Sequence, residues 1–466
     1  MKLFDTFDNT VKDFKPVNKD CVSIYVCGAT PYDKPHLGHI LSMIRYDMIR
    51  RYLLHKGYKV KFVTNFTDID DKTINKAAKE GVDFSHIAKR YMPMYMNIFE
   101  SMRLHPDSKY ILATDFIDQI LAMTRILKQK GFAYQIDGDG IYFEVSKFSE
   151  YGKLAKRDLE SQLAGARVDV NVLKKAPEDF VLWKFAKDGE PAWMDPVKEI
   201  PDGRPGWHLE CSAMIYDQFL GETVDIHGGG SDLIFPHHEC EIAQSECAFG
   251  NKLANHWLHN GLMNIKDEKM SKSLGNFLTI EDVIDNYSYN VLRYYFTSTH
   301  YRAPLSFSED SLESAKASLD TLQNTIDRVN SQLAQEKFAD VEFAPETIAS
   351  ALEKFEQAMD NDMDISGALS HVFELSSQIN SSLDVDGMSE KSLLNILDFF
   401  KKIDSVIAVF EINPLALDNE LKEMLEKRLA ARAARDFKQA DSLRNKIEAR
   451  GIKIQDTKDG YDIKFA

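Results

Sequence analysis

The sequence predicts an α/β protein in which an insertion splits a Rossmann-type parallel sheet. An α-helical bundle and a small C-terminal α+β domain follow. Three observations lead to this prediction. Residues 22–66 run strand, loop, helix, strand, which is the unit of a doubly wound parallel sheet. Strand-like and helical patterns return at 206–260 after an irregular stretch, and beyond about residue 310 few Gly or Pro interrupt a helical pattern.

The N-terminal elements follow from apolar spacing and from their end signals. Residues 22–27 (VSIYVC) form a short apolar run typical of a buried strand, and a loop with Gly28, Pro31 and Pro35 follows. An amphipathic helix is expected over 38–57, with Gly57 as its stop, and a strand over 58–66.

Later elements are less regular. We expect helix from about 86 to 130 and mixed short strands from 131 to 205. Near the C-terminus, 425–451 predicts one helix, and two short strands are expected around 456–460.

At about 150 residues per domain, 466 residues suggest roughly three domains. The patterns place their limits as follows: a Rossmann catalytic domain at 1–114 and 206–260, a connective insertion at 115–205, a linking region at 261–310, a helical bundle at 311–415 and a C-terminal domain at 416–466.

Composition excludes several classes of protein. With 44% hydrophobic and 28% charged residues, the chain has a globular balance and not that of a disordered protein. Five cysteines are too few for a disulfide-stapled miniprotein and fit a reducing compartment. No apolar stretch approaches the roughly 18 residues of a membrane span, and the N-terminus lacks the apolar core of a signal peptide. We therefore expect a cytoplasmic protein with no membrane partner.

The charge is uneven along the chain. The net charge is −16, which by itself argues against a nucleic-acid partner. Residues 311–420 carry a net −14, however, and 421–466 carry a net +4. The C-terminal end can therefore bind RNA even though the whole chain is acidic. The alternative is that the acidic block is simply a solvated helical face.

A candidate nucleotide site lies where the first strand passes into the first helix. His36 and His39 are three residues apart on the first turn, and Gly38 lets a ligand approach the backbone. The unpaired N–H groups at a helix start favour a phosphate. The alternative, a histidine cap beside a surface histidine, stays open on this pattern alone.

A polar loop supplies a second element. Residues 266–276 place Lys269 and Lys272 three apart, and such lysines can hold phosphates as negative charge builds at a transition state. The two elements together resemble the HIGH and KMSKS signatures of class I aminoacyl-tRNA synthetases, with Leu37 in place of Ile. The resemblance implies amino-acid adenylation with ATP and Mg²⁺, His36 and His39 stabilising the α-phosphate, and Lys269 and Lys272 holding pyrophosphate.

A glycine run is the third element of the nucleotide site. His227, Gly228, Gly229 and Gly230 precede Asp232, which can accept hydrogen bonds from ribose hydroxyls. Glycines let a flat base or ribose approach the backbone. We interpret this segment as ATP-binding, and the alternative is a flexible glycine turn.

Metal ligands can be drawn from three distant segments. His237 and Glu241 have i,i+4 spacing on one helix face, with Pro236 well placed to start that helix. Cys27 and Cys211 would complete a Cys₂HisGlu set that suits zinc. Spacing alone does not identify this set, and buried thiols beside an ordinary helix pair are the alternative. Cys240 and Cys247 share a helix face and are expected to be buried apolar residues.

Over nearly its full length the sequence resembles bacterial-type cysteinyl-tRNA synthetases. The resemblance rests on TNFTDIDDK (64–72), AGARV (164–168), GWHLECSAM (206–214), DIHGGGSDLIFPHHECEIAQSE (225–246) and KMSKSLGN (269–276). It implies one zinc ion per subunit on Cys27, Cys211, His237 and Glu241, with the substrate thiolate as a further ligand. It also implies that Gly28, Thr67, Trp207 and Asp232 line the amino-acid pocket, although core packing is an alternative for Trp207.

The activity implied is that of an ATP-dependent ligase. L-cysteine and ATP would give cysteinyl-adenylate, and the cysteinyl group would pass to the 3′ end of tRNA(Cys) with release of AMP and pyrophosphate. Packing alone separates cysteine from serine by only about 10–200-fold, whereas zinc prefers a thiolate to a hydroxyl. We expect a monomer.

Two other functions stay open. The related cysteine ligase of mycothiol biosynthesis shares these motifs, and the wording CGATPYDKPHLGH (27–39) is closer to that ligase. His227 and the tail 428–460, which resembles the anticodon-binding module, favour the synthetase. A non-catalytic tRNA-binding paralogue would have no need of His36, His39 or Lys272, all of which are present.

Overall fold

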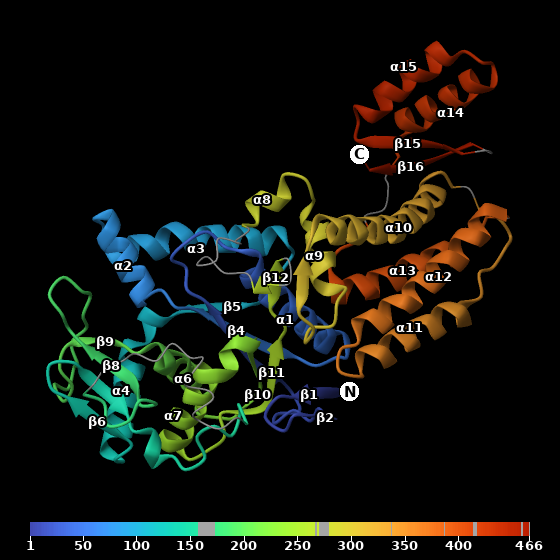
Figure 1. Ribbon diagram of the computed structural model, residues 1–466. Coiled ribbons are helices and arrows are strands. Elements are labelled where there is room, and N and C mark those ends of the chain that lie inside the picture. The colour runs from blue at the N-terminus through green and yellow to red at the C-terminus, as the bar shows by residue number, and fades with distance from the viewer. Residues whose placement is uncertain are drawn as a thin grey trace. The chain divides into compact units, whose positions relative to one another are not determined.

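The computed structural model describes residues 1–156, 173–265, 268–269, 279–336, 338–385, 387–412, 417–457 and 460–465. The chain divides into two compact units, Met1–Tyr289 with Tyr301–Ser308, and Asn290–His300 with Glu309–Ala466 (Figure 1). Among the helices described, none combines the length and the apolar character that crossing a bilayer requires.

The first unit is built on a parallel sheet of five strands, which confirms the predicted α/β fold. The strand order is β11-β10-β3-β4-β5, and every neighbouring pair is parallel. The central strands are apolar along most of their length because a doubly wound sheet is covered on both faces. The strands are β3 (Val22–Ala29), β4 (Val60–Phe66), β5 (Lys109–Leu112), β10 (Val224–Gly230) and β11 (Ala254–Asn260).

The strand order reverses between β3 and β10, and this reversal positions the site. From β3 the chain passes through α1 (Leu37–His55) to β4 on one side. From β10 it passes through α7 (Glu239–Phe249) to β11 on the other side. At such a point the carboxyl ends of the two strands open a crevice where ligands bind.

The continuous helical pattern expected at 86–130 is wrong in its middle. The helix α3 (Phe84–Ser101) ends before Pro106, and β5 follows as the edge strand of the sheet. A short turn η1 (Ala113–Phe116) then leads into α4 (Ile117–Gln129). The chain leaves α3 through Arg103, whose left-handed φ of 57° ends the helix, and a four-residue edge strand leaves too short a pattern to recognise. The remaining helix of this crossover is α2 (Asp71–Glu80).

Between β5 and β10 the chain forms a second, antiparallel sheet of order β6-β7-β8-β9. Trp183 and Phe143 from this sheet belong to a core that also takes in α4 and α6 (Trp207–Gln218). Figure 1 shows these helices beside the sheet. The elements are β6 (Ala133–Ile136), β7 (Gly140–Phe143), η2 (Val145–Lys147), β8 (Phe180–Phe185) and β9 (Gly203–Pro205).

Smaller elements complete the first unit. Arg45 of α1 is fully buried and donates from one nitrogen to the carbonyls of Gly261, Tyr301 and Ala303 at 3.1, 2.7 and 3.0 Å. It thereby joins α1 to the small β13-β12-β14 sheet. The other elements are β1 (Lys2–Asp5), β2 (Thr10–Asp13), η3 (Ser231–Leu233), η4 (Ile234–His238), β12 (Met263–Ile265), β13 (Glu268–Lys269), α8 (Glu281–Ile284) and β14 (Leu305–Phe307).

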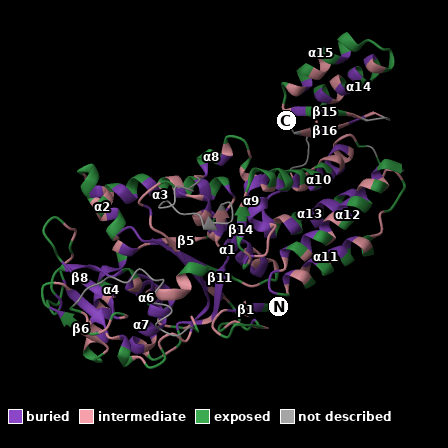
Figure 2. Ribbon diagram, viewed as in Figure 1, coloured by how far each residue is buried: buried purple, intermediate pink, exposed green. Residues whose placement is uncertain are grey.

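The second unit contains the predicted helical bundle and the small α+β region. Figure 2 shows that the bundle helices each carry a buried stripe and an exposed one, as amphipathic helices do. The helices are α9 (Tyr289–Thr297), which starts at the boundary, α10 (Glu309–Ala334), α11 (Pro345–Met359), α12 (Ile365–Val385) and α13 (Glu390–Ile407). The five finer domain limits stay a prediction.

The single helix expected at 425–451 is wrong: two helices occupy this region. The helix α14 (Asn419–Ala433) ends, Arg435 takes a left-handed φ of 60°, and α15 (Phe437–Glu448) begins. The side chain of Asp436 caps α15 by accepting from the Gln439 N–H at 3.0 Å. Both helices pack on the hairpin β15 (Ile452–Thr457) and β16 (Gly460–Phe465), which confirms the two expected strands.

Candidate functional site

A cavity of about 340 Å³ opens at the carboxyl ends of β3, β4 and β10. It lies where the strand order reverses, as the fold predicts. Of the residues singled out from the sequence, the ones that line it are Cys27, Gly28, His36, Gly38, His39, Trp207, Gly230 and Asp232. The segments that carry them are far apart in the chain, and the sheet brings them together.

The histidine pair stands at the start of α1 on the cavity wall. His36 caps the helix, and its Nδ1 accepts from the His39 N–H at 3.3 Å. The two imidazole rings stack with their centroids 3.5 Å apart. Both rings and the helix N-terminus therefore face the cavity from one turn, in the arrangement expected of a phosphate site.

Tyr95 of α3 contacts the second histidine. Its hydroxyl lies 2.9 Å from His39 Nδ1, and its ring is 1% exposed. Phe66 and Phe99 pack against the ring edge to face, with centroids 5.7 and 6.2 Å away. Because this aromatic packing fixes the ring, the hydroxyl holds the His39 imidazole in one orientation. Tyr95 was not predicted from the sequence, because no local motif marks it.

The glycine run on β10 divides between two roles. Gly230 and Asp232 line the cavity. At Gly228, in contrast, an added Cβ would lie 2.3 Å from the Tyr46 ring, and at Gly229 it would lie 2.8 Å from Leu233. Gly228 and Gly229 therefore make room for the protein's own side chains. The reason predicted from the sequence for all three glycines, that a ligand approaches the backbone, applies at most to Gly230.

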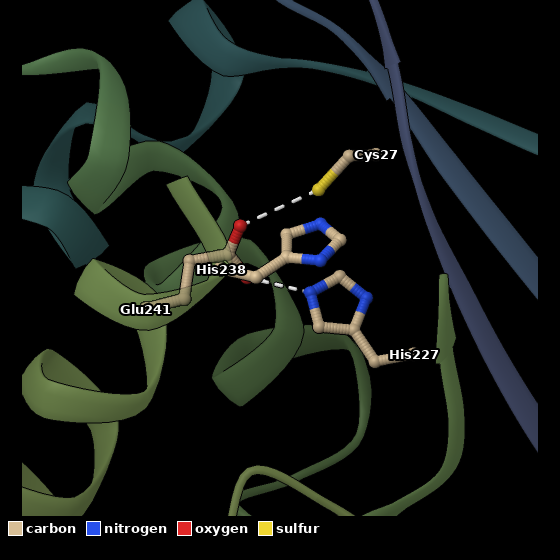
Figure 3. Close-up of side chains that lie close together, drawn as sticks. All are labelled: Cys27, His227, His238 and Glu241. Carbon is tan, nitrogen blue, oxygen red and sulfur yellow. Dashed lines mark hydrogen bonds and ion pairs between the residues drawn. The ribbon is translucent and has the colours of Figure 1, made fainter. Parts of the chain in front are cut away.

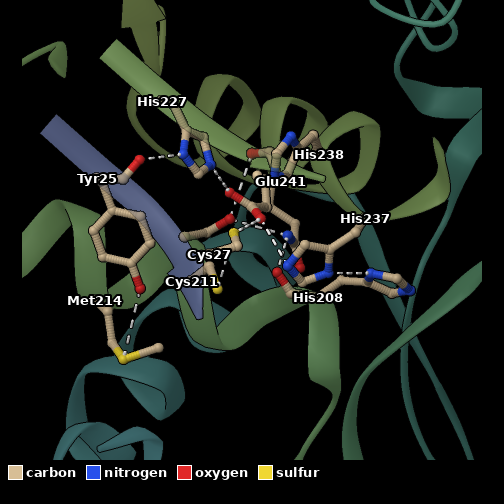
Figure 4. A network of polar contacts seen from close by, with 12 residues as sticks. Tyr25, Cys27, His208, Cys211, Met214, His227, His237, His238 and Glu241 are labelled. Carbon is tan, nitrogen blue, oxygen red and sulfur yellow. Dashed lines mark hydrogen bonds and ion pairs between the residues drawn. The ribbon is translucent and has the colours of Figure 1, made fainter. Parts of the chain in front are cut away.

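A cluster of donor atoms lies at the cavity end that Cys27 lines (Figure 4). Cys27 Sγ is 3.6 Å from Cys211 Sγ and 3.4 Å from Glu241 Oε1. His237 Nε2 is 2.9 Å from the same Glu241 oxygen. All four residues are buried, and one ligand atom from each lies within 4.8 Å of the others. Pro236 stands in η4 and α7 begins at Glu239, so the helix starts later than expected, yet the i,i+4 contact forms.

The charges of this cluster fit a divalent cation. Burial opposes ionisation of Glu241, but His227 and His237 outweigh it and hold its pKa well below 4.5. A hydrogen bond from the Cys27 thiol lowers the pKa of Cys211 to about 6, whereas burial raises the pKa of Cys27. Burial also opposes protonation of His237, but Glu241 and Cys211 raise its pKa to about 10. A cation would replace the proton on His237 beside two anionic donors.

A second set of donors shares two residues with the first (Figure 3). Cys27 and Glu241 also lie within 4.8 Å of His227 and His238. His227 Nε2 is 2.6 Å from Glu241 Oε2, and its Nδ1 is 3.0 Å from the Tyr25 carbonyl. His227 is fully buried and lies in this cluster, away from the cavity lining, so its assignment to ATP stays a prediction that the lining does not support.

Three histidines around the cluster were missed from the sequence. His238 Nδ1 is 2.8 Å from His259 Nε2, and His208 Nδ1 is 3.0 Å from His237 Nδ1. Burial lowers the pKa of His208 and of His259 to about 3, so both rings are neutral at pH 7. The adjacent pair His237–His238 was the available signal, but only His237 had helical spacing to Glu241.

Three predicted pocket residues have further contacts. Trp207 is 39% exposed at the cavity and stacks on His237 with centroids 4.3 Å apart. Gly28 permits close packing, since an added Cβ would lie 1.6 Å from the Asn65 carbonyl oxygen. Thr67 is buried and accepts from the Asn65 amide at 3.3 Å.

The lysine loop and the segment 164–168 lie largely outside the described residues. The backbone of Lys269 pairs with Asn264 in the β12–β13 ladder. Lys272 lies outside the described range, and its role stays a prediction. Cys240 and Cys247 are 1% and 7% exposed, which confirms the expectation that both are buried.

Two family models match this chain. The family described as tRNA synthetases class I (C) catalytic domain matches residues 13–317, and the DALR domain family matches 354–411. A cysteine–tRNA ligase of Finegoldia magna is 43% identical over 99% of this chain and 98% of that protein. A cysteine–tRNA ligase of Thermococcus gammatolerans is 42% identical over the same shares.

Solved structures support the fold. A methionyl-tRNA synthetase of Mycobacterium tuberculosis, in complex with methionyl-adenylate, superposes with a TM-score of 0.64 at 18% identity. The match covers 84% of this chain and 92% of that one.

Proposed function

The chain belongs to the cysteine–tRNA ligases of the class I synthetase family, and from this premise we propose how its cavity performs the reaction. The substrates are cysteine, ATP and tRNA, and the products are cysteinyl-tRNA, AMP and pyrophosphate. We propose that Cys27, Cys211, His237 and Glu241 hold zinc, and that Mg²⁺ accompanies ATP.

The four donors stand at the end of the cavity where the amino-acid side chain would enter. When zinc is bound there, it supplies a soft Lewis acid that prefers the substrate thiolate to the hydroxyl of serine. The chain's own residues shape the approach. Cys27 and Trp207 both line the cavity, and the Trp207 ring covers His237 from the cavity side. Gly28 and Asp232, on β3 and beyond β10, would face the rest of the amino acid.

Adenylation takes place farther along the same cavity. The cysteine carboxylate attacks the α-phosphate of ATP, and His36, Gly38 and His39 at the α1 N-terminus would bind the charge that develops there. Gly230 and Asp232 would bind the nucleoside. Lys269 and Lys272 would hold the departing pyrophosphate. Tyr95 keeps His39 oriented through the 2.9 Å contact with Nδ1.

For the transfer step, the small domain at 416–466 would contact tRNA(Cys), because its segment 421–466 carries a net charge of +4. The full-length matches to cysteine–tRNA ligases do not favour the mycothiol ligase. Both histidines of the pair line the cavity, which does not favour a non-catalytic paralogue. We propose that the chain acts as a monomer.

The zinc assignment rests on the four buried donors that meet at the cavity end. The second donor set, which contains His227 and His238, is the alternative that the experiment must exclude. The variant Cys211→Ser removes a ligand of the proposed set only, and His238→Asn removes a ligand of the other set only. Cys247→Ser is the matched control, since Cys247 is also a buried thiol but belongs to neither set.

Metal content by plasma emission and cysteine-dependent exchange of pyrophosphate into ATP are measured for each variant. We expect Cys211→Ser to lose zinc and to weaken cysteine activation by at least about tenfold, as loss of a metal ligand does. His238→Asn and Cys247→Ser should keep zinc. Zinc lost from His238→Asn but kept in Cys211→Ser would assign the metal to the second set.

A further inference from the structure

The cavity has a cationic and aromatic edge at the start of α2 that the proposed chemistry leaves unused. Lys72, the second residue of α2, lines the cavity together with Tyr32 of the loop after β3. The Lys72 ammonium lies over the Tyr32 ring, 5.4 Å from its centroid. Lys72 is exposed and Tyr32 is half-buried, so both can reach a ligand.

The Lys72 ammonium keeps its charge available. Among the described residues, no carboxylate lies within 4.0 Å of it, whereas Lys76 lies 3.5 Å from Asp33. The two neighbouring acids in the sequence, Asp70 and Asp71, bind other groups than the Lys72 ammonium. Asp70 caps α2 by accepting from the backbone N–H of Lys72, and Asp71 pairs with Lys184 and Arg204 at 2.8 and 2.6 Å.

The same pairing recurs one turn along α2. The Lys76 ammonium lies over the ring of Tyr91 on α3, 4.6 Å from its centroid, and the Arg90 guanidinium lies 5.9 Å from the same ring. Lys72 and Lys76 have i,i+4 spacing, so they share one face of the helix. Tyr91 is buried in a small apolar core, so the second pair offers no ring on which a base can stack. At the first pair the half-buried Tyr32 ring lines the cavity and can stack on a base, and the Lys72 ammonium can meet a phosphate, as in sites that bind single-stranded nucleic acid.

The place of Lys72 in the cavity indicates whether it binds ATP or RNA. The proposed ATP residues lie at the ends of β3 and β10, whereas Lys72 follows β4, on the far side of β3 from β10. The reaction needs a second nucleotide ligand, the 3′ end of the acceptor RNA, in the same cavity. We propose that Lys72 and Tyr32 bind the 3′-terminal single strand of the tRNA. This inference rests on the proposed function.

The test separates the two half-reactions in the full-length protein. Cysteine-dependent pyrophosphate exchange needs no RNA, and charging of a tRNA(Cys) transcript needs both steps. The variant Lys72→Ala is compared with Lys79→Ala, a control on the same helix, exposed and absent from the cavity lining. Lys72→Arg keeps the charge and should restore charging. Tyr32→Phe keeps the ring, and Tyr32→Leu removes it.

We expect Lys72→Ala to lower kcat/KM for the transcript about tenfold while exchange changes by less than about twofold. The slope of log binding affinity against log salt should fall by about 1, as for the loss of one phosphate contact. Tyr32→Leu should lower charging about 5- to 150-fold more than Tyr32→Phe, as for the loss of one stacked base.

Different outcomes would contradict the RNA site and the proposed function. Exchange falling in parallel with charging would assign Lys72 to ATP and overturn the RNA site. Charging unaltered in Lys72→Ala and Tyr32→Leu would also overturn it. A wild-type protein that exchanges pyrophosphate with cysteine but does not charge the transcript would overturn the proposed function, and this inference with it.

Discussion

Removing the hydroxyl of Tyr95 tests whether the aromatic cluster behind α1 orients His39, to which we assign a catalytic role. The hydroxyl lies 2.9 Å from His39 Nδ1, and the ring is held between Phe66 and Phe99. In Tyr95→Phe the ring keeps these contacts, so the change is confined to one hydrogen bond. The His39 imidazole then loses the partner that fixes its rotation beside His36.

The size of the effect follows from that single bond. A neutral hydrogen bond contributes a net of about 0.5–1.5 kcal/mol. If the orientation is needed only in the transition state of adenylation, this corresponds to a rate lower by about 2- to 13-fold. The KM for cysteine should stay unchanged, because Tyr95 does not touch the donor cluster. A split between kcat and KM therefore distinguishes positioning from general loosening.

The assay is steady-state pyrophosphate exchange with cysteine and ATP varied in turn. Tyr110→Phe is the matched control: its ring stacks on Phe99 with centroids 5.5 Å apart and lines the same cavity, but its hydroxyl bonds to Ser108. We expect wild-type rates for the control. Equal rates for Tyr95→Phe and Tyr110→Phe, or a rise in the cysteine KM without loss of kcat, would refute the positioning role.

Two further predictions concern stability. Arg45→Met removes the guanidinium that donates to three carbonyls, and should lower the free energy of unfolding by about 3 kcal/mol or more in a urea titration. Arg45→Lys should recover part of this loss. A change below about 1 kcal/mol in Arg45→Met would contradict the bridging role. Burial opposes ionisation of Asp195, but backbone N–H donors and Arg125 outweigh it and hold its pKa below 3.8. The contribution of Asp195 to stability is therefore complete above pH 3.8 and is lost as the pH falls through the folded-state pKa. The melting temperature of Asp195→Asn should be lower than that of the wild type at pH 7 and should fall less steeply in acid. Parallel curves of melting temperature against pH for the two proteins would contradict this.

The sequence predicted the elements whose patterns are long or that carry clear end signals. The strand 22–27, the helix 38–57 and the strand 58–66 correspond to β3, α1 and β4 within two residues. The strand β5 was missed because it has four residues at the sheet edge, with one of them buried. Short edge strands are defined by their neighbour, and a single sequence does not show the neighbour.

The break between α14 and α15 was missed for a different reason. The run AARAARDFKQ consists mostly of good helix formers, so propensity argues for continuity. Asp436 and Gln439 have the spacing of a capping box, and Asp436 does cap α15. The signal was present in the sequence, and helix propensity outweighed it in the interpretation.

The candidate metal site shows most clearly how little sequence spacing alone can predict. Sequence spacing could link only His237 to Glu241. Cys27 and Cys211 were candidates by residue type, and the resemblance selected them for the proposed zinc set. The structure adds what resemblance did not contain, a second set that shares Cys27 and Glu241. The two sets share these ligands, so a single ion can use only one of them.

Access to the cavity distinguishes the two sets. In the second set, His227 is already bonded to Glu241 and to the Tyr25 carbonyl, and His238 is bonded to His259 behind it. Neither of these imidazoles lines the cavity. In the first set, His237 lies directly beneath Trp207, which does line it. An ion that must receive a ligand from the cavity therefore belongs on the first set, and His227 of the second set is left to hold Glu241 ionised and in place for it.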